Sequence, residues 1–495
     1  MVAALFVRLL CMVWLLALLR VPLLAQALPA LEAAVQALEQ DAAMRPANWG
    51  MTVMDARTGQ VLLAHNAYRN QATASVMKVV TTAAALGVLG ADFRFATTLA
   101  YSGTLSDGVL QGDLYIRGTG DPSLGSARFG TTYDLSALMA AWVQGVKAAG
   151  IREVRGRVIG DDRFFSTQLT PGTWNWEDMG NYYGAGASGL NFLENLYRLD
   201  LKPGPQAGSA TEVLRTDPAI ADLQFVNELT TGKPGSGDNA YIYGAPYTGL
   251  RYLRGSIPAG SAVFSIKGSI PDPALLAAQR LHEELGQCGV PVQAGATSTR
   301  RLKQAGMPVA AALRDIHTWQ SPPLRDLVRE TNLESLNLYA EALARRVAVA
   351  RGKTAPDAAA AAQVLDEYWR SQGIDTRGMC LCDGSGLSPG NMLSTHQLAA
   401  ILVKARQTGY YEALYASLPV AGRSGSLSSM LKGTAAEGNL RAKSGYIQGV
   451  RSYAGYVQTR SGKELTFAVI ANGYSGTPGE MRRRLETLMQ RLAEE

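Results

Sequence analysis

The chain has 495 residues, of which 47% are hydrophobic and 18% are charged, a composition that excludes a disordered chain. Its length favours two or three domains over a single hydrophobic core. The formal net charge of +6 is small for this length, and no cluster of Lys and Arg of the kind that binds nucleic acid is present.

The N-terminus has the pattern of a secretory signal peptide. A positive charge precedes an apolar run (9–19), and a small-x-small sequence ends at Ala27. A retained membrane anchor is the alternative, but Arg20 and Pro22 interrupt the apolar stretch, which is short for a span of about 20 residues. We therefore expect residues 1–27 to be removed and the protein to be exported, with no stable membrane span after cleavage.

Of the four cysteines, Cys11 would leave with the signal peptide, and Cys288, Cys380 and Cys382 would remain. An odd number permits at most one intramolecular disulfide. A bond between Cys380 and Cys382 would be strained, because alternate residues of a strand point to the same side without their sulfurs meeting. We expect buried, unbonded thiols and leave a disulfide open. None of the four histidines lies near this Cys-x-Cys sequence, so a metal site there lacks ligands.

The first part of the chain predicts a helix (28–44), a hairpin (51–65) and a helix from Ser75 to Leu89, with Thr73 as its N-cap. Residues 96–299 are different in character. They are rich in Gly, Pro and short β-like runs, and they predict an inserted, largely β region of one or two lobes.

Helices return at about residue 310, and 324–351 is strongly helical. A last helix follows Pro478. Between them, short turns join three strand candidates into an antiparallel meander: 440–447, 451–460 and 463–472. These elements predict an α+β fold in which residues 28–95 and 300–495 form an antiparallel sheet covered by helices. The N-terminal hairpin would complete that sheet around the insertion.

The sequence argues against a Ser-His-Asp hydrolase. The G-x-S-x-G sequence at 386–390 needs a helix that starts at its serine, and Pro389-Gly390 is a poor helix start. The only histidine after Ser388 is His396, with no acid between them. We interpret this match as chance. No zinc, P-loop or dinucleotide-binding spacing occurs either, so no metal or cofactor is expected.

A serine nucleophile without imidazole needs another base, and a buried lysine with a depressed pKa can serve. Ser75 and Lys78 form an S-x-x-K sequence, and residues i and i+3 of a helix lie on one face, so the amine can reach the hydroxyl. The positive field of the helix N-terminus favours negative charge near Ser75. Because S-x-x-K recurs at Ser429 and Lys432, the motif alone is weak.

Two further motifs follow S-x-x-K along the chain. Ser335-Leu336-Asn337 lies in a helical segment, and Lys443-Ser444-Gly445 lies on the first strand of the terminal meander. The trio of S-x-x-K, S-D-N and K-T-G is typical of β-lactamases and penicillin-binding proteins. S-x-N and K-[ST]-G each occur only once in the chain. Together the three motifs predict a serine acyl-transfer site.

On these motifs, the chain resembles the class C low-molecular-mass penicillin-binding proteins, which are serine D-alanyl-D-alanine carboxypeptidase/endopeptidases. The resemblance covers nearly all of the mature chain, including the large insertion that compact β-lactamases lack. It implies a penicillin-binding/β-lactamase-like transpeptidase domain, a bacterial periplasmic location, peptidoglycan peptides as substrates and β-lactam antibiotics as covalent ligands. Besides the motifs, similar stretches are 114–124, 154–165, 182–191, 268–273, 321–343, 383–388 and 432–445.

The resemblance also implies a role for each residue of the site. Ser75 would form the acyl-enzyme, with Lys78 as its general base, helped by Lys443. Ser335 would relay a proton to the departing D-alanine amine, and Asn337 would hold the substrate backbone. The residues implied in substrate binding are Ser444, which with Lys443 would bind the terminal carboxylate, Gly445 beside it, and Tyr446, whose N–H would form the oxyanion hole with that of Ser75.

The chain departs from the family pattern at three positions. Leu336 replaces an Asp that is a structural support, and Ser444 replaces Thr but keeps the hydroxyl. Pro389 stands where the family often has an Arg that helps to read the third residue of the peptide, so the preferred peptide stays open. Asp161 and Asp162 are weak candidates for contacting that residue, and surface acids are the simpler interpretation.

Two other functions remain as alternatives. A β-lactamase would need a deacylating base, and no Glu-x-x-Leu-Asn sequence occurs between Asn337 and Lys443. Such an enzyme would turn penicillin over rapidly. A non-catalytic cell-wall-binding protein could keep the fold, but it would have no need for the complete set of reactive residues.

Overall fold

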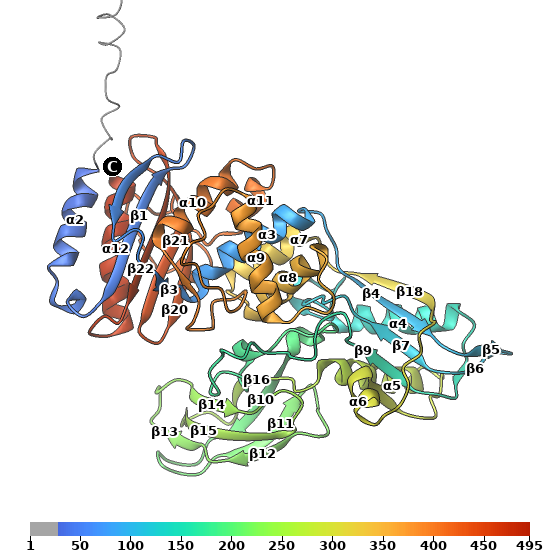
Figure 1. The fold of residues 1–495 in the computed structure, drawn as a ribbon. Helices are drawn as coiled ribbons and strands as arrows, with labels where there is room; N and C mark the ends of the chain where they lie inside the picture. The colour runs from blue at the N-terminus through green and yellow to red at the C-terminus, as the bar shows by residue number, and fades with distance from the viewer. Residues whose placement is uncertain (1–27) are drawn as a thin grey trace, which may run out of the picture.

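The computed structural model describes residues 28–495 (Figure 1). The predicted signal peptide, its cleavage site and Cys11 lie outside the described residues. Within the described part of the chain, every helix is too short or too polar to cross a bilayer.

One end of the molecule is a five-stranded antiparallel sheet with the strand order β2-β1-β22-β21-β20. The predicted terminal meander is confirmed, and the N-terminal hairpin adds to it through β1, which pairs with the last strand, β22. The strands are β1 (Asn48–Asp55), β2 (Val61–His65), β20 (Arg441–Ile447), β21 (Val450–Gln458) and β22 (Glu464–Asn472). The sheet therefore joins the two ends of the described chain, with β20 at its edge.

Helices cover both faces of this sheet (Figure 1). On one face, α2 (Pro29–Glu39) and α12 (Pro478–Glu494) pack on each other and bury apolar side chains at helical spacing. On the other face, α10 (Thr395–Arg406) contacts β1 and β22. The helix predicted for 28–44 ends earlier than expected, because a short 3-10 turn capped by Asp41 follows it.

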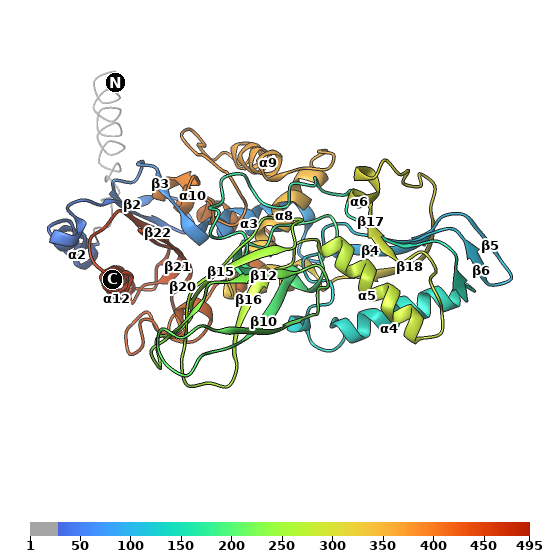
Figure 2. The same cartoon turned by 90° about the horizontal axis from the view of Figure 1, so that it is seen from below.

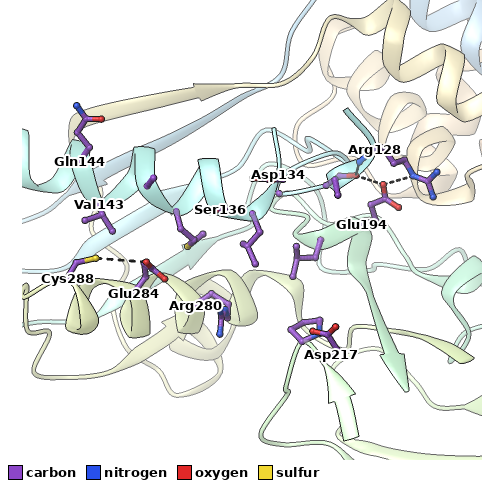
Figure 3. A pocket seen from close by; sticks show the side chains of 18 of the residues that line it. Arg128, Asp134, Ser136, Val143, Gln144, Glu194, Asp217, Arg280, Glu284 and Cys288 are labelled. Atoms are coloured by element: carbon purple, nitrogen blue, oxygen red, sulfur yellow. Dashed lines mark hydrogen bonds and ion pairs between the residues drawn. The ribbon is translucent and has the colours of Figure 1, made fainter. Parts of the chain in front are cut away.

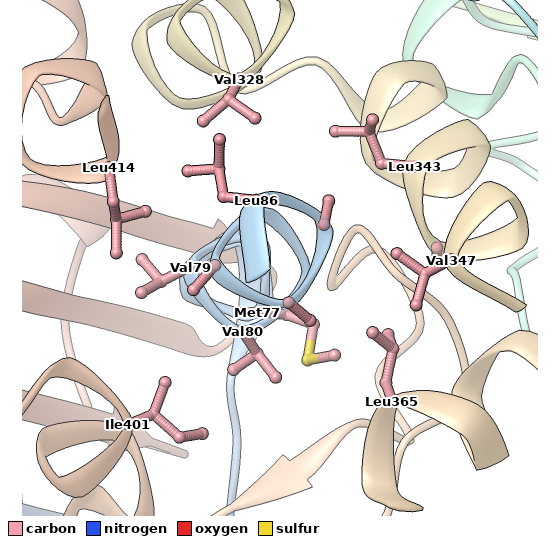
Figure 4. Close-up of a cluster of buried hydrophobic side chains, with 14 of the residues drawn as sticks. Met77, Val79, Val80, Leu86, Val328, Leu343, Val347, Leu365, Ile401 and Leu414 are labelled. Carbon is pink, nitrogen blue, oxygen red and sulfur yellow. The ribbon is translucent and has the colours of Figure 1, made fainter. Parts of the chain in front are cut away.

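Next to the sheet is a helical block built around α3 (Met77–Leu89). Every residue of α3 from Met77 to Leu86 is buried, so its neighbours surround the helix on all sides. Figure 4 looks along α3 and shows side chains of the surrounding helices pointing at it. The neighbours are α7 (Leu324–Leu333), α8 (Asn337–Ala350), α9 (Ala358–Ser371), α10 and α11 (Tyr411–Ser417). This packing fixes the rotation of α3, and with it the direction of the side chains in its first turn.

Two details of the helical prediction are wrong. The helix expected over 324–351 is broken into α7 and α8, and Ser335 between them has a left-handed backbone with φ of 58°. Thr73 makes no capping bond, because a 3-10 turn, η2 (Ala74–Val76), precedes α3. Ser75 therefore lies on this turn and not on the α-helix itself.

We refer to residues 96–320, from β4 to β18, as the insert. The expected β structure is present, in four sheets with the orders β17-β9-β7-β4-β18, β11-β10-β16, β12-β15-β13 with β14 paired to β15, and β5-β6-β8. The prediction missed two long helices, α4 (Leu135–Ala148) and α5 (Pro273–Gln287), and a shorter one, α6 (Thr299–Gln304). Figures 1 and 2 both show α4 and α5 at the end of the molecule opposite the five-stranded sheet of β1, β2 and β20–β22.

The strand β18 pairs with β4, so the first of these sheets contains residues on both sides of position 299. The strands of the insert are β4 (Ala96–Tyr101), β5 (Thr104–Ser106), β6 (Val109–Gln111), β7 (Leu114–Arg117), β8 (Glu153–Val154), β9 (Val158–Asp161), β10 (Leu196–Lys202), β11 (Glu212–Asp217), β12 (Gln224–Asn227), β13 (Thr230–Gly232), β14 (Asn239–Tyr243), β15 (Leu250–Pro258), β16 (Phe264–Ser269), β17 (Ala296–Ser298) and β18 (Arg314–Gln320).

The three described cysteines are unbonded, but the expectation of buried thiols is wrong for Cys380, which is exposed. Cys288 and Cys382 are partly buried. Cys380 lies outside any strand and pairs only through an isolated bridge with Met392, so no neighbouring layer covers its side chain.

Candidate active site

The Lys78 amine contacts residues of both the S-x-x-K and the S-x-N motifs. Lys78, in the first turn of α3, places its Nζ 3.1 Å from Ser75 Oγ and 2.6 Å from Asn337 Oδ1. Asn337 is the first residue of α8, far away in the sequence. The packing of α8 against α3 therefore brings the S-x-x-K and S-x-N motifs together.

The third motif contacts the second through another amine. Lys443 on β20 donates from Nζ to Ser335 Oγ at 2.9 Å and to the Ser444 carbonyl at 2.8 Å. The broken junction between α7 and α8 thus carries Ser335 toward Lys443 and Asn337 toward Lys78. One short segment connects the two lysines.

Strand β20 runs directly against the turn that carries the nucleophile. A Cβ added to Gly445 would lie 2.8 Å from the Thr73 carbonyl oxygen and 3.0 Å from Ser75 N, so only glycine permits this approach. Ser444 Oγ lies 2.7 Å from Ser426 Oγ. The Tyr446 side chain is about half exposed, at 51%, with the Arg451 guanidinium over its ring.

Burial sets the protonation of both lysines. Burial lowers the pKa of Lys78 to about 7, against the opposing effect of the carboxyls of Asp383 and Glu341. The pKa of Lys443 is held well below its usual value by burial and then by the charge of Lys78. A neutral amine is therefore accessible at neutral pH, which an exposed lysine does not provide.

A loop at residues 383–388 forms the wall of the site behind Lys78. Lys78 Nζ donates to the Ser385 carbonyl at 2.7 Å. Asp383 holds the loop by accepting the N–H groups of Gly386 at 2.6 Å and Ser388 at 2.7 Å. The G-x-S-x-G sequence lies in this loop, and Ser388 is buried within it, which does not fit an exposed nucleophile elbow.

The insert also reaches the site. Asn337 Nδ2 donates to the Tyr183 carbonyl at 2.8 Å, so one amide contacts both Lys78 and the insert. Arg345, two turns later on α8, is fully buried and donates to the carbonyls of Leu169 at 2.8 Å and Ala187 at 2.9 Å. The insert is therefore fixed to the helix that carries Asn337.

Three contributors to the site were missed by the sequence analysis: Glu341, Asp383 and the carbonyl of Tyr183. Glu341 had a visible signal, because it follows Asn337 by four residues and so lies on the same helical face. Asp383 lies in a stretch recognised only as similar to the family. No pattern points to a main-chain carbonyl of a remote loop.

The weaker candidates have partners outside the three motifs. Asp161 and Asp162 are buried and not surface acids: Asp161 pairs with Arg163, and Asp162 accepts from Thr299 at 2.7 Å. Burial raises the pKa of Asp162 to about 6. Ser429 of the second S-x-x-K is exposed and accepts a bond from Arg482.

A cavity of about 1220 Å³ lies apart from these residues, in the insert between α4 and α5 (Figure 3). Its lining includes Val143, Glu194 and Arg280 and none of the residues of the three motifs. The convergence of the motifs, and not the size of this cavity, therefore identifies the candidate active site.

Comparison with known proteins agrees with this geometry. The model of the D-Ala-D-Ala carboxypeptidase 3 (S13) family matches residues 31–494, a range that includes all three motifs and the insert. The chain belongs to the S13 family. It is therefore a serine-type D-Ala-D-Ala carboxypeptidase/endopeptidase family member, as the resemblance implied.

Individual relatives of this S13 enzyme are consistent with that assignment. It is 34% identical over 460 residues to a D-alanyl-D-alanine carboxypeptidase of Actinomadura sp. (strain R39), covering 89% of this chain and 81% of the relative. It is 25% identical to the D-alanyl-D-alanine carboxypeptidase DacB of Haemophilus influenzae, covering 90% and 89%.

The fold is that of a solved S13 relative. The crystal structure of penicillin binding protein 4 (dacB) from Haemophilus influenzae superposes with a TM-score of 0.78 at 22% identity, covering 93% of this chain and 98% of that one. The predicted α+β fold, with its large insertion, is thereby confirmed.

Proposed function

We propose that this S13 enzyme hydrolyses D-Ala-D-Ala ends or cross-links of peptidoglycan through an acyl-enzyme on Ser75. The observation that carries the proposal is the 3.1 Å separation of Ser75 Oγ from Lys78 Nζ, at an amine whose pKa is lowered to about 7 by burial. An amine with that pKa is neutral in a large fraction of molecules near neutral pH, so it can accept the hydroxyl proton.

The contacts of Lys78 orient this base. A neutral amine has two N–H bonds and one lone pair. The two acceptors Asn337 Oδ1, at 2.6 Å, and the Ser385 carbonyl, at 2.7 Å, take the two N–H bonds. The lone pair is left for Ser75, which donates its proton to Nζ as Oγ attacks the peptide carbonyl carbon.

The attack places negative charge on the carbonyl oxygen. The N–H groups of Ser75 and Tyr446 would receive that charge, because β20 lies against the turn that carries Ser75. One such donor contributes about 3 kcal/mol to the stability of the transition state. Collapse of the tetrahedral intermediate breaks the C–N bond and leaves an ester on Ser75.

The departing amine needs a proton. Ser335 Oγ is bonded to Lys443 Nζ at 2.9 Å, so Ser335 can donate its proton to the amine and be reprotonated from Lys443. Lys443 and Ser444 would bind the terminal carboxylate, and a carboxylate beside Lys443 favours the charged form of that amine. The proton that Lys78 took from Ser75 replaces the one that Lys443 gave up, so its transfer to Lys443 restores both amines. Water then attacks the ester, Lys78 takes the proton of the water, and that proton passes to Ser75 Oγ as the ester C–O bond breaks.

We extend the proposal to antibiotics and to location. A structure of the Haemophilus influenzae relative holds a β-lactam, which supports acylation of Ser75 by β-lactams in this chain. The apolar N-terminal run and the site ending at Ala27 support export to the bacterial periplasm. The pairing of β18 with β4 supports an inserted region that extends to about residue 320, within a catalytic domain made of the segments before and after it.

Two measurements on the purified enzyme test the proposal. Peptidoglycan fragments should lose their terminal D-alanine, or their cross-links, and penicillin should block the reaction. Mass mapping of the penicillin adduct should place it on Ser75, with Ser75→Ala unlabelled and Ser429→Ala labelled as in the wild type. An adduct on another residue would remove Ser75 from its role, and rapid turnover of penicillin would favour the β-lactamase alternative.

A further inference from the structure

Glu341 has a buried carboxyl beside the active site that the mechanism above does not use. Its side chain is 1% exposed and lies on α8, four residues after Asn337. Oε1 accepts the N–H groups of Gly384 and Ser385, each at 2.9 Å. Oε2 has no hydrogen-bond partner among residues 28–495. A buried acid with an unpaired oxygen destabilises a fold, so its presence calls for a role.

The peptide unit between residues 384 and 385 is held at both ends. Its N–H, from Ser385, donates to Glu341, and its carbonyl, from Gly384, accepts from Thr81 Oγ1 at 2.6 Å. Because a peptide unit is planar, these two bonds fix its orientation. Gly384 is required there, since an added Cβ would lie 2.8 Å from the Ala340 carbonyl oxygen.

The next carbonyl along the chain, that of Ser385, accepts from Lys78 Nζ at 2.7 Å. We propose that Glu341 is a positioning residue for acylation. By holding the N–H groups of Gly384 and Ser385, it directs the Ser385 carbonyl at Lys78 and so keeps the lone pair of the amine on Ser75. This inference rests on the function proposed above, in which Lys78 is the base.

The Ser385 carbonyl affects the base because a neutral amine has only two N–H bonds, which need two acceptors. With both acceptors in place, neither N–H of Lys78 needs to point at Ser75. If the Ser385 carbonyl turned away, one N–H would seek another acceptor, and the oxygen of Ser75 is 3.1 Å away. The lone pair would then rotate off the hydroxyl proton, and the base would be present but misdirected.

The protonation of Glu341 shows which of its properties acts on Lys78. The titratable groups around Lys78 are Asp383 from the loop, Glu341 from α8 and Lys443 from β20, and Arg345 faces Glu341. Burial raises the pKa of Glu341 to about 8, whereas burial lowers the pKa of Lys78 to about 7. The Glu341 carboxyl is therefore mostly neutral where Lys78 titrates, and it acts through its acceptor oxygen, a role that a neutral amide can replace.

The experiment compares Glu341→Gln with Glu341→Leu in the full-length enzyme. Stopped-flow acylation by a fluorescent penicillin gives the rate plateau and the acid limb of the pH profile. Glutamine keeps an acceptor oxygen and resembles the neutral carboxyl, so its plateau and its acid limb should both stay near the wild-type values. Leucine removes the acceptor, so its plateau should fall roughly 10- to 100-fold, the scale of a misplaced catalytic group.

Two further variants serve as controls for the role of Glu341. Thr81→Val removes the hydrogen bond to the Gly384 carbonyl and replaces threonine with an uncharged side chain of similar volume. The plateau of this variant should fall, and its acid limb should stay in place. Glu330→Leu removes a half-buried acid of α7 and should change neither quantity. Burst amplitude counts the folded sites, so poor folding lowers the amplitude and not the rate.

The outcomes distinguish a failure of the role of Glu341 from a failure of the proposed function. A leucine variant at the wild-type plateau, or a glutamine variant as slow as the leucine variant, overturns the role of Glu341. If the leucine variant has no burst amplitude, the Thr81→Val plateau decides in its place. A wild-type enzyme that penicillin does not acylate at Ser75 overturns the proposed function instead.

Discussion

Gly386 touches Ala74, the residue before the nucleophile: a Cβ on Gly386 would lie 1.9 Å from the Ala74 carbonyl oxygen. Gly386 also has a φ of 82°, in the left-handed region that favours glycine. The loop that bonds to Lys78 and the turn that carries Ser75 therefore meet backbone to backbone. The geometry of the base and that of the nucleophile depend on one another through this contact.

The first prediction tests that contact with Gly386→Ala. The added methyl must displace the backbone of the loop or of the turn, so we expect a loss of about 3 kcal/mol or more in the free energy of unfolding, together with slow acylation. Gly433→Ala is the control, because Gly433 has a similar φ of 74° but open space around it. It should lose only about 1 kcal/mol and acylate normally. Urea unfolding and penicillin acylation measure both, and equal losses would show that conformation, not contact, matters at Gly386.

The second prediction concerns the base itself. Lys78→Ala should slow acylation by penicillin at least about 100-fold while the protein stays folded, which is the usual scale for a general base. In the wild type, the rate should rise as the pH passes about 7, because Lys78 is active when neutral. Near-normal acylation by Lys78→Ala would assign the proton transfer to another group, and circular dichroism checks the fold.

The third prediction links Lys78 to stability. Its pKa is about 7 in the folded enzyme because of burial, and about 10.4 in the unfolded chain. Between these values the unfolded chain binds more protons, so wild-type stability should gain from Lys78 as the pH rises from about 7 to about 10. Lys78→Met should show a smaller rise over that window in urea unfolding. An identical slope in both proteins would contradict a buried Lys78 with a lowered pKa.

The fourth prediction separates chemistry from backbone strain at Ser335. Its φ of 58° is unfavourable for any residue with a side chain, so Ser335→Gly relieves strain and should keep or raise the melting temperature. The same change removes the hydroxyl that contacts Lys443, and peptide hydrolysis should fall at least about 100-fold. Ser335→Ala should be equally inactive without the gain in stability. An active Ser335→Gly enzyme would exclude the hydroxyl from proton transfer.

Local spacing explains which features the sequence could predict. Ser75 and Lys78 are three residues apart, and the meander containing Lys443 consists of strands joined by short turns, so both follow from short-range patterns. The left-handed backbone at Ser335 has no such signal, since the surrounding sequence is uniformly helical in pattern and tertiary packing imposes the break.

Features that depend on contacts between residues far apart in the sequence could not be predicted. Glu341 reaches Gly384 across 43 positions, and the bond from Asn337 to the Tyr183 carbonyl spans 154. No periodicity relates residues at such separations. The helices α4 and α5 were missed for another reason, because they are embedded in a region whose glycines, prolines and short apolar runs are typical of β structure.

The last prediction tests how the insert is held to the active site. Arg345 is fully buried, and it donates to the carbonyls of Gln168, Leu169 and Ala187. Arg345→Met leaves those carbonyls unpaired, at about 1 to 3 kcal/mol each, so stability should fall by several kcal/mol. Because the same stretch includes Tyr183, which accepts from Asn337, hydrogen exchange should quicken across 168–187.

Arg346→Met is the matched control for this change. Arg346 is adjacent on α8, but its guanidinium stacks over Phe93 and makes no bond to these carbonyls, so its loss should be about 1 kcal/mol. Exchange in 168–187 should then match the wild type. If both variants quicken exchange equally, the three carbonyl bonds do not hold the insert. If only Arg345→Met does so, and hydrolysis of peptide falls while acylation by the smaller penicillin is retained, the insert serves to place the peptide beside Asn337.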